Sequence, residues 1–548
     1  MDVLLLVVVA MLVAVLLVGV GDRLHLPWPV LMLVIAAGAA FVPGVDAPDL
    51  DPELILPLFL PPLLYATAQR TSWALFRARW RSIAFLAVGL VLVTVAAVAG
   101  TVWALVPGIG VAATIALGAA VAPPDPVAVE AVAGTTGMPR RLVATLQSEG
   151  LFNDAISLVI FQTAVAAAVA GDGLGVAVLG RFAYGLVVAV VVGLVAARLV
   201  AAITNRLTDA TATSALTLVL PFAVYLGADA LGASGVIAVV VAALQTRSHA
   251  DADASEERIT GRAFWNVVEM LVTGVAFALI GLELRGTVLD ARDDLGRLLA
   301  HAAVVCAVVV GVRAAWMALS LVAIRRSRRL ADAAASPRTP GEAVVLAWSG
   351  MRGLATLALA LAIPTVTASG APFPDRAELV LTATSVLVVT LVLPGLTLPL
   401  LLRALGMRET AGARTEAERR LMTRARRAAI ADLDAVDRAT LGVDDEAGEQ
   451  VLADLRTRFA RLAGVLPDAS GAVSTTGSAR TEAEEADYHE RLARLRRRRE
   501  QWSRLQEVGL AAARREVLTA RSEAGTDPQV ADRVLRRLDV RSLALPGE

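Results

Sequence analysis

Long apolar runs alternate with short polar segments along the first three quarters of the chain. A transmembrane helix needs about 20 consecutive, mostly apolar residues, and thirteen runs approach or exceed that length. They lie near residues 3–20, 28–43, 53–68, 82–106, 109–133, 142–170, 174–202, 211–230, 232–246, 263–284, 298–323, 341–365 and 377–404. The pattern predicts an all-α polytopic membrane protein, with a transmembrane domain over residues 1–406 and 13 transmembrane helices.

The pattern changes after residue 406, where Arg, Glu, Asp and Ala replace the apolar runs. Residues 407–548 are predicted to form a separate helical cytoplasmic tail. Glu416–Leu433 and His489–Arg515 have the composition of charged helices, and a polar linker is expected near Asp468–Ser478. A regulatory or dimer-stabilising role for the tail is a hypothesis, motivated by its length and its charged helical pattern.

The distribution of arginine predicts the orientation of the chain in the membrane. Loops after odd-numbered runs, with the adjoining ends of the runs, hold roughly 17 arginines, whereas loops after even-numbered runs hold roughly 4. Basic residues concentrate on the cytoplasmic side of membrane proteins. We therefore expect a multi-pass protein of the cell membrane, with its N-terminus outside and its tail in the cytoplasm.

Two of the predicted spans are interrupted. The fifth contains Ala122-Pro123-Pro124-Asp125-Pro126, and three prolines in four residues prevent a continuous helix. The twelfth contains Trp348-Ser349-Gly350-Met351-Arg352-Gly353. Broken helices in corresponding positions of two halves are typical of the substrate sites of transporters. Ends of half-helices that face each other would leave partial charges for Asp125 and Arg352 to offset.

The sixth span places ionisable residues beside an apolar stretch, in the run Glu149-Gly150-Leu151-Phe152-Asn153-Asp154. Ionisable groups in a membrane helix are costly and usually functional. Glu149 and Asp154 are five residues apart and project from different faces of the helix. We expect Glu149 to form a buried structural ion pair with Arg352, and Asp154 to bind the transported ion. Asn153 shares a face with Glu149, and Asp125 is either a helix cap, an ion ligand or both.

Other chemistries lack their residues. The four histidines show no metal-ligand spacing and no nucleophile–base pair, and the single cysteine, Cys306, cannot form a disulfide within one chain. We therefore expect no enzyme activity, no cofactor and no nucleic-acid partner.

The motifs resemble those of the cation:proton antiporter 1 family, the bacterial and eukaryotic sodium/proton exchangers. The resemblance covers roughly residues 1–406. It is carried by five segments, which are Leu60–Tyr65, Asp125-Pro126, Glu149–Asp154, Phe277–Leu282 and Gly350–Gly353. The Asn153-Asp154 pair with its preceding Glu149 is the specific part.

The resemblance implies inverted repeats, crossed broken helices in the fifth and twelfth spans, a homodimer and an elevator-like movement of a core domain. It assigns Asp154 as the ion- and proton-binding carboxylate, and Asp125 and Asn153 as further residues of a monovalent-cation site. It also supports the pairing of Glu149 with Arg352.

Three positions depart from the family pattern. Ala66, Pro124 and Gly150 stand where members often carry an acid, Thr and Ser, so three oxygen-bearing side chains are missing. Thr67, Ser157 or backbone carbonyls at the break are candidate replacements.

A carboxylate in a half-dry cavity holds either a proton or a cation. With one titrating acid beside an amide, electroneutral exchange of one cation for one proton is expected, of Na⁺ or Li⁺ in the first instance. The alternatives are a K⁺/H⁺ antiporter that uses the same site, and a membrane sensor that binds cations without transporting them.

Overall fold

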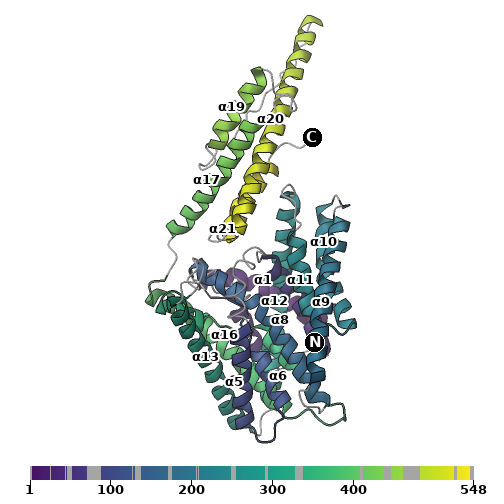
Figure 1. Cartoon of the computed structure of the whole chain (residues 1–548), viewed down its shortest axis with the longest axis vertical. Coiled ribbons are helices and arrows are strands. Elements are labelled where there is room, and N and C mark those ends of the chain that lie inside the picture. Colours follow the sequence, from purple (N-terminus) through teal and green to yellow (C-terminus); the bar gives the residue numbers. More distant parts are fainter. Residues whose placement is uncertain are drawn as a thin grey trace. The chain divides into compact units, whose positions relative to one another are not determined.

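A computed structural model of the chain (Figure 1) describes most of the 548 residues. The described residues are 3–24, 26–43, 45, 52–70, 88–125, 128–129, 137–170, 176–204, 206–207, 209–248, 255–290, 294–326, 337–407, 411–436, 446–460, 482–523 and 528–543.

Helices make up nearly all of this described structure, and its only β-pairing is one isolated bridge between Val366 and Pro372. The helices up to residue 407 are α1 (Val3–Leu24), α2 (Trp28–Ala39), α3 (Pro52–Arg70), α5 (Leu90–Leu105), α6 (Val111–Val121), α8 (Arg140–Ala170), α9 (Val176–Thr204), α10 (Ala210–Ala230), α11 (Gly235–Ser248), α12 (Ser255–Asp290), α13 (Leu295–Arg326), α14 (Pro340–Trp348), α15 (Leu354–Leu361) and α16 (Arg376–Ala404).

Each predicted apolar run overlaps one of these helices, and the run at 341–365 overlaps two, α14 and α15. Parts of the fourth, fifth and seventh runs, at 82–87, 126–127, 130–133 and 174–175, lie outside the described residues. Among the described helices, six are long and apolar enough to cross a membrane by length and composition, and six apolar helices are shorter. The protein is therefore all-helical and rich in membrane-type helices.

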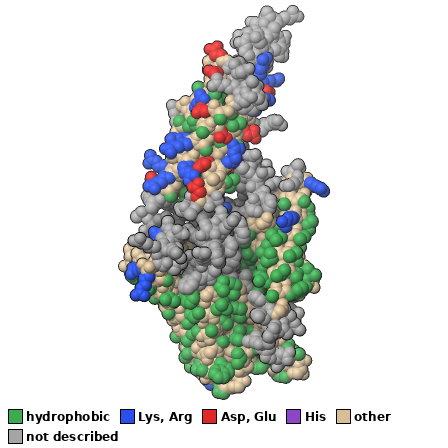
Figure 2. Space-filling model, in the orientation of Figure 1, with side chains coloured by type: hydrophobic (Ala, Val, Ile, Leu, Met, Phe, Trp, Pro, Cys, Tyr) green, Lys and Arg blue, Asp and Glu red, His purple; other side chains and the backbone are tan. Residues whose placement is uncertain are grey.

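The chain divides into two compact units, one of Met1–His249 with Thr260–Glu409 and one of Ala250–Ile259 with Thr410–Glu548. The surface of the first unit is apolar. Hydrophobic side chains cover most of its described surface in Figure 2, and leucines such as Leu4 and Leu400 are 75% and 61% exposed. Such a surface is costly in water but matches the hydrocarbon of a bilayer.

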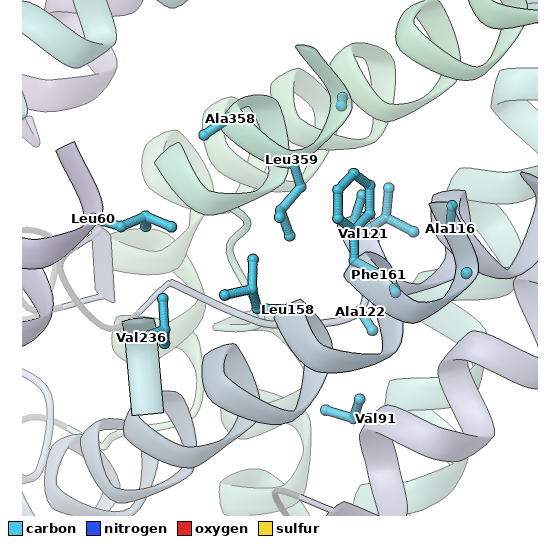
Figure 3. Close-up of a cluster of buried hydrophobic side chains, with 14 of the residues drawn as sticks. Leu60, Val91, Ala116, Val121, Ala122, Leu158, Phe161, Val236, Ala358 and Leu359 are labelled. Atoms are coloured by element: carbon cyan, nitrogen blue, oxygen red, sulfur yellow. The ribbon is translucent and has the colours of Figure 1, made fainter. Parts of the chain in front are cut away.

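Small and branched apolar residues fill the interior of the first unit. Figure 3 shows one part of this core, where Val121 and Ala122 at the end of α6 lie near Phe161 of α8 and Leu359 of α15. Alanines and glycines let helix backbones approach closely in membrane proteins. This packing holds α6, α8 and α15, the elements that carry the interruptions and the acidic run, in one cluster.

The second unit contains α17 (Ala411–Ala435), α19 (Glu446–Ala460), α20 (Glu482–Ser522) and α21 (Pro528–Leu543), which pack against one another around leucine, valine and alanine side chains. The predicted helices Glu416–Leu433 and His489–Arg515 lie within α17 and α20, whereas the sequence interpretation did not include α19 and α21. The predicted linker Asp468–Ser478 lies outside the described residues. Arg514 and Asp539, 3.1 Å apart, form an ion pair in the interior of this unit.

An ion-pair network joins α17 to α20 at the surface of the second unit. Arg424 donates to Glu516 Oε1 at 2.9 Å and to both carboxylate oxygens of Glu523, at 2.7 and 2.9 Å. The hydrogen bonds from Arg424 hold the pKa of Glu523 below its ordinary value of 4.5. The same hydrogen bonds, which Glu523 and Glu516 accept, raise the pKa of Arg424.

We predict that Arg424→Ala raises the pKa of Glu523 towards 4.5. Because the pKa of Glu523 is lower in the folded state than in the unfolded state, the pair stabilises the tail above pH 4.5. That contribution disappears as the pH falls through the folded-state pKa. Carboxyl-carbon NMR titration of a 410–548 fragment measures this pKa. Arg420→Ala is the control, because Arg420 pairs with Glu416 on the same helix. An unchanged pKa in Arg424→Ala would contradict the assignment.

Candidate cation site

Two interruptions of helical structure meet inside the first unit. The helix α6 ends at Val121 and the chain continues without helix through Asp125, while α14 ends at Trp348 and α15 begins at Leu354. The backbone N–H of Asp125 donates to the carbonyl of Met351 at 2.7 Å. The two non-helical segments are therefore hydrogen-bonded to each other, although Asp125 and Met351 are 226 positions apart in the chain.

The Asp125 carboxylate lies at backbone N–H groups on both sides of this crossing. Its Oδ2 accepts from the N–H of Leu354, the first residue of α15, at 3.3 Å, and its Oδ1 accepts from Ala128 at 3.4 Å. The first N–H groups of a helix have no partner within the helix and form its positive end. Asp125 thus caps the N-terminal end of α15.

Arg352 bonds to the C-terminal ends of helices, where carbonyl groups lack partners within the helix. Its guanidinium donates to the carbonyls of Val121 at 2.9 Å and Ala122 at 3.2 Å, at the C-terminal end of α6, and to the carbonyl of Gly350. These carbonyls form the negative ends of α6 and α14. The pattern predicted from the sequence for Asp125 and Arg352 is therefore present.

The predicted ion pair between Glu149 and Arg352 was wrong. Glu149 is paired with Arg313 of α13, through bonds of 2.6 Å from Nη1 to Oε1 and 3.1 Å from Nη2 to Oε2. Arg313 also donates from Nε to the carbonyl of Leu346 in α14, at 3.1 Å. The side chains of Glu149 and Arg313 are 1% and 2% exposed, so the pair is buried and joins α8, α13 and α14.

The prediction failed because the carbonyl groups at the helix ends also need a hydrogen-bond donor. The carbonyls around the crossing need a cation, and Arg352, which lies within the break, meets that need. Glu149 then requires another cation, and Arg313 in the middle of α13 requires an anion. Gly350 admits the Arg313 side chain, because a Cβ at Gly350 would overlap it. The sequence interpretation did not identify Arg313 as the partner of Glu149.

A pocket lies beside the crossing and contains both predicted ion-binding carboxylates. Its lining is mostly apolar, with two acids and two threonines, and consists of Leu60, Leu63, Leu64, Thr67, Asp125, Gly150, Asp154, Thr273, Phe277, Leu354 and Ala355. In the described part of the chain, Oδ1 of Asp154 is buried and accepts no hydrogen bond.

The other predicted site residues are placed differently. Asn153 does not line the pocket, and its buried carboxamide makes no hydrogen bond within the described residues. Ser157 is buried and donates to the carbonyl of Ala119 in α6, so it braces α8 against α6 and does not line the pocket. Thr67 does line the pocket, and its hydroxyl donates to the carbonyl of Leu63 at 2.9 Å.

The sequence interpretation missed Thr273 of α12, which lines the pocket. A signal was available, because Thr273 lies four residues before Phe277 and therefore on the same helix face as the start of the Phe277–Leu282 motif. Within the described residues, no group of three or more His, Cys, Asp or Glu side chains forms a multidentate metal site.

We predict that Glu149→Gln destabilises the protein by about 3–5 kcal/mol, because it leaves the buried Arg313 charge unpaired. Adding Arg313→Met removes both charges and should restore a large part of that stability. Reversible unfolding in mixed micelles measures both changes. Arg297→Met is the matched control, because the ion pair of Arg297 with Asp294 is about 60% exposed and contributes at most about 1 kcal/mol. A Glu149→Gln variant as stable as the control would refute a structural role for the pair.

Gly353→Ala should destabilise the crossing by about 1–3 kcal/mol, the usual effect of overpacking. A Cβ at Gly353 would overlap the Asp125 carboxylate, so either the cap of α15 or the backbone must shift. Thermal unfolding in detergent provides the measurement. Gly311→Ala is the control, since a Cβ there meets nothing within 4 Å. Equal unfolding temperatures for the two variants would show that the contact is not required.

Comparison with known proteins identifies the family. The family model described as sodium/hydrogen exchanger, transmembrane, matches residues 7–404. A protein from Mycobacterium tuberculosis named as an uncharacterized Na⁺/H⁺ exchanger is 34% identical over 405 residues, covering 73% of this chain and 74% of the relative. A sodium, potassium, lithium and rubidium/H⁺ antiporter of Bacillus pumilus is 30% identical over 383 residues, covering 66% of this chain and 55% of the relative.

Among solved structures, the sodium proton antiporter MjNhaP1 of Methanocaldococcus jannaschii matches with a TM-score of 0.57 and 17% sequence identity, covering 75% of this chain and all of that chain. This likeness shows that the fold is similar to that of a sodium/proton antiporter. Together with the family match over residues 7–404, it leads to one conclusion: this chain belongs to the sodium/hydrogen exchanger family.

Proposed function

We propose that the protein is a secondary active transporter that exchanges Na⁺ or Li⁺ for H⁺ at Asp154, across the cell membrane. The observation that carries the proposal is the state of Asp154. Its carboxylate lines a pocket together with Asp125, and its buried Oδ1 has no hydrogen-bond partner in the described structure. A buried carboxylate oxygen without a hydrogen-bond partner is costly, and a proton or a cation would each remove that cost.

Exchange follows from competition for this carboxylate. Carboxylate and hydroxyl oxygens are hard ligands that suit alkali cations. A proton on Asp154 removes the charge that holds the cation, so the two substrates exclude each other. A carrier that changes access only when Asp154 is neutralised would return with a proton after releasing a cation.

We infer electroneutral exchange of one cation for one proton, because the partner of Asp154 in the sequence is the amide Asn153, which does not titrate. Moving one net charge across the membrane is worth about 2.3 kcal/mol per 100 mV. An electroneutral exchanger should therefore turn over at the same rate when the membrane potential is clamped at different values.

K⁺/H⁺ exchange at the same site is the second candidate. The family pattern places oxygen-bearing side chains at Ala66, Pro124 and Gly150, where this chain has none. The related antiporter of Bacillus pumilus is named for sodium, potassium, lithium and rubidium. A poorer set of oxygens favours an ion that loses its water more readily, which is K⁺.

The proposal extends to the arrangement of the chain in the membrane. We propose thirteen spans with inverted repeats, the N-terminus outside, the tail in the cytoplasm, and a homodimer with a moving core domain. The arginine distribution supports this orientation. The role of the tail, regulatory or dimer-stabilising, stays a prediction.

We predict that Asp154→Asn lowers exchange at least tenfold while leaving the fold intact, because an amide of the same shape takes up no proton. Purified protein in liposomes with an imposed pH gradient is given Na⁺, Li⁺, K⁺ or choline, and dequenching of a pH dye reports exchange. The control is Asp294→Asn, which replaces a carboxylate that is 61% exposed.

The possible results of this assay distinguish the candidate functions. A response to Na⁺ and Li⁺ that Asp154→Asn lacks supports sodium/proton exchange at this residue. A response to K⁺ alone changes the substrate and keeps the mechanism. Protein that binds cations but exchanges none would support a non-transporting sensor. Full activity in Asp154→Asn would contradict the assigned site.

A further inference from the structure

Thr273 combines two properties that, among the described residues, only Asp154 shares. Its side chain lines the pocket that contains Asp125 and Asp154. Its Oγ1 is also buried and makes no hydrogen bond within the described structure, and the residue is 2% exposed. The other threonine of the pocket, Thr67, differs because its hydroxyl donates to the carbonyl of Leu63.

The missing hydrogen bond is unusual for a threonine in a helix. Such hydroxyls normally bond to the carbonyl four residues earlier, as those of Thr94, Thr101, Thr384 and Thr390 do, at 2.7–2.8 Å. Leaving a buried hydroxyl unsatisfied is unfavourable. A ligand in the pocket would provide the partner that the helix does not.

Unsatisfied hydroxyls alone do not identify a ligand. Thr356 of α15 and Ser349 also carry buried hydroxyls without partners among the described residues, but neither lines the pocket. Location in the pocket is the second observation, and it separates Thr273 from both. Thr356 is thereby a matched control, with the same residue type, the same burial class and the same lack of a partner.

We propose that Thr273 is a cation ligand of this pocket, and that its hydroxyl oxygen favours Na⁺ and Li⁺ over K⁺. The proposal rests on the exchange function proposed above and extends it to a specificity-determining residue on α12. The hydroxyl lone pairs coordinate the cation, while Asp154 supplies the charge that the cation neutralises.

The preference for small ions follows from dehydration. A smaller cation holds its water more tightly, so the site must replace more of its hydration shell with protein oxygens. Removing one oxygen from a pocket that is otherwise largely apolar should therefore weaken Li⁺ and Na⁺ binding more than K⁺ binding.

The test compares Thr273→Val, Thr273→Ser and Thr356→Val with the wild-type protein in liposomes. Valine keeps the shape of threonine and removes an oxygen that has no protein partner, so both valine variants should fold. The apparent KM for Na⁺, Li⁺ and K⁺ is measured at several pH values by dequenching of a pH dye.

We expect Thr273→Val to raise the KM for Na⁺ and Li⁺ about tenfold, equivalent to about 1.4 kcal/mol of binding free energy, and the KM for K⁺ by less than about threefold. The maximal rate should stay within about twofold. Because protons compete at Asp154 and not at Thr273, the KM should rise by the same factor at every pH, with an unchanged midpoint of its pH dependence. Thr273→Ser should retain the wild-type KM, and Thr356→Val should too.

Three results would overturn the proposal: an unchanged KM in Thr273→Val, an equal rise for Na⁺ and K⁺, or the same rise in Thr356→Val. Isothermal titration of the purified proteins with NaCl separates this proposal from the exchange function. If the wild-type protein binds Na⁺ but exchanges nothing, the exchange function fails, and weaker Na⁺ binding by Thr273→Val still supports the ligand. If the wild-type protein exchanges Na⁺ and Thr273→Val binds it equally well, the ligand assignment fails alone.

Discussion

The crossing of the two interrupted segments depends on one constraint, which is that backbone polar groups inside a membrane need partners within the protein. Breaking α6 and the α14–α15 pair exposes helix ends of both signs. Asp125 accepts hydrogen bonds from the N–H groups, and Arg352 donates to the carbonyls. Each side chain serves a segment on the opposite side of the crossing. The two side chains therefore hold the segments together and bond to backbone groups that the interrupted helices leave without helical partners.

The charges around the crossing are compensated by partners within the protein, except at one carboxylate. Among the described residues of this region, Glu149 is neutralised by Arg313, and Arg352 and Asp125 are each held by helix ends of opposite sign. Asp154 has no such compensation and lies in the pocket close to Asp125. Because the neighbouring charges are already compensated, a proton or cation bound at Asp154 would change the net charge of this region. The proposed exchange at Asp154 relies on that change.

The tail follows different physics. Its helices α17, α19, α20 and α21 bury their own leucine and valine side chains, and ion pairs such as Arg424–Glu523 lie on its surface. This is the packing of a water-soluble helical domain. In water, amphipathic helices of this kind are stabilised by burying their apolar side chains against one another. The first unit instead exposes many apolar side chains on its surface. The surface of the tail therefore suits water, and the surface of the first unit suits the hydrocarbon of a bilayer.

The sequence by itself determined the helical, membrane-embedded character of the chain and the places where α6 and the α14–α15 pair are interrupted, and it singled out Asp125 and Asp154, which line one pocket. These features are local, because apolar runs, clustered prolines and paired glycines act through the residues that carry them. Only the tertiary structure decided which charges meet. Glu149 could have paired with Arg352 or Arg313, and the choice depended on the carbonyl ends that Arg352 satisfies and on the space beside Gly350. Thr273 reaches the pocket, and Ser157 is withdrawn to Ala119, because of how α12 and α8 pack against neighbouring helices. Which side chains from distant segments pair depends on how close the folded chain brings them. Their positions in the sequence do not give that distance.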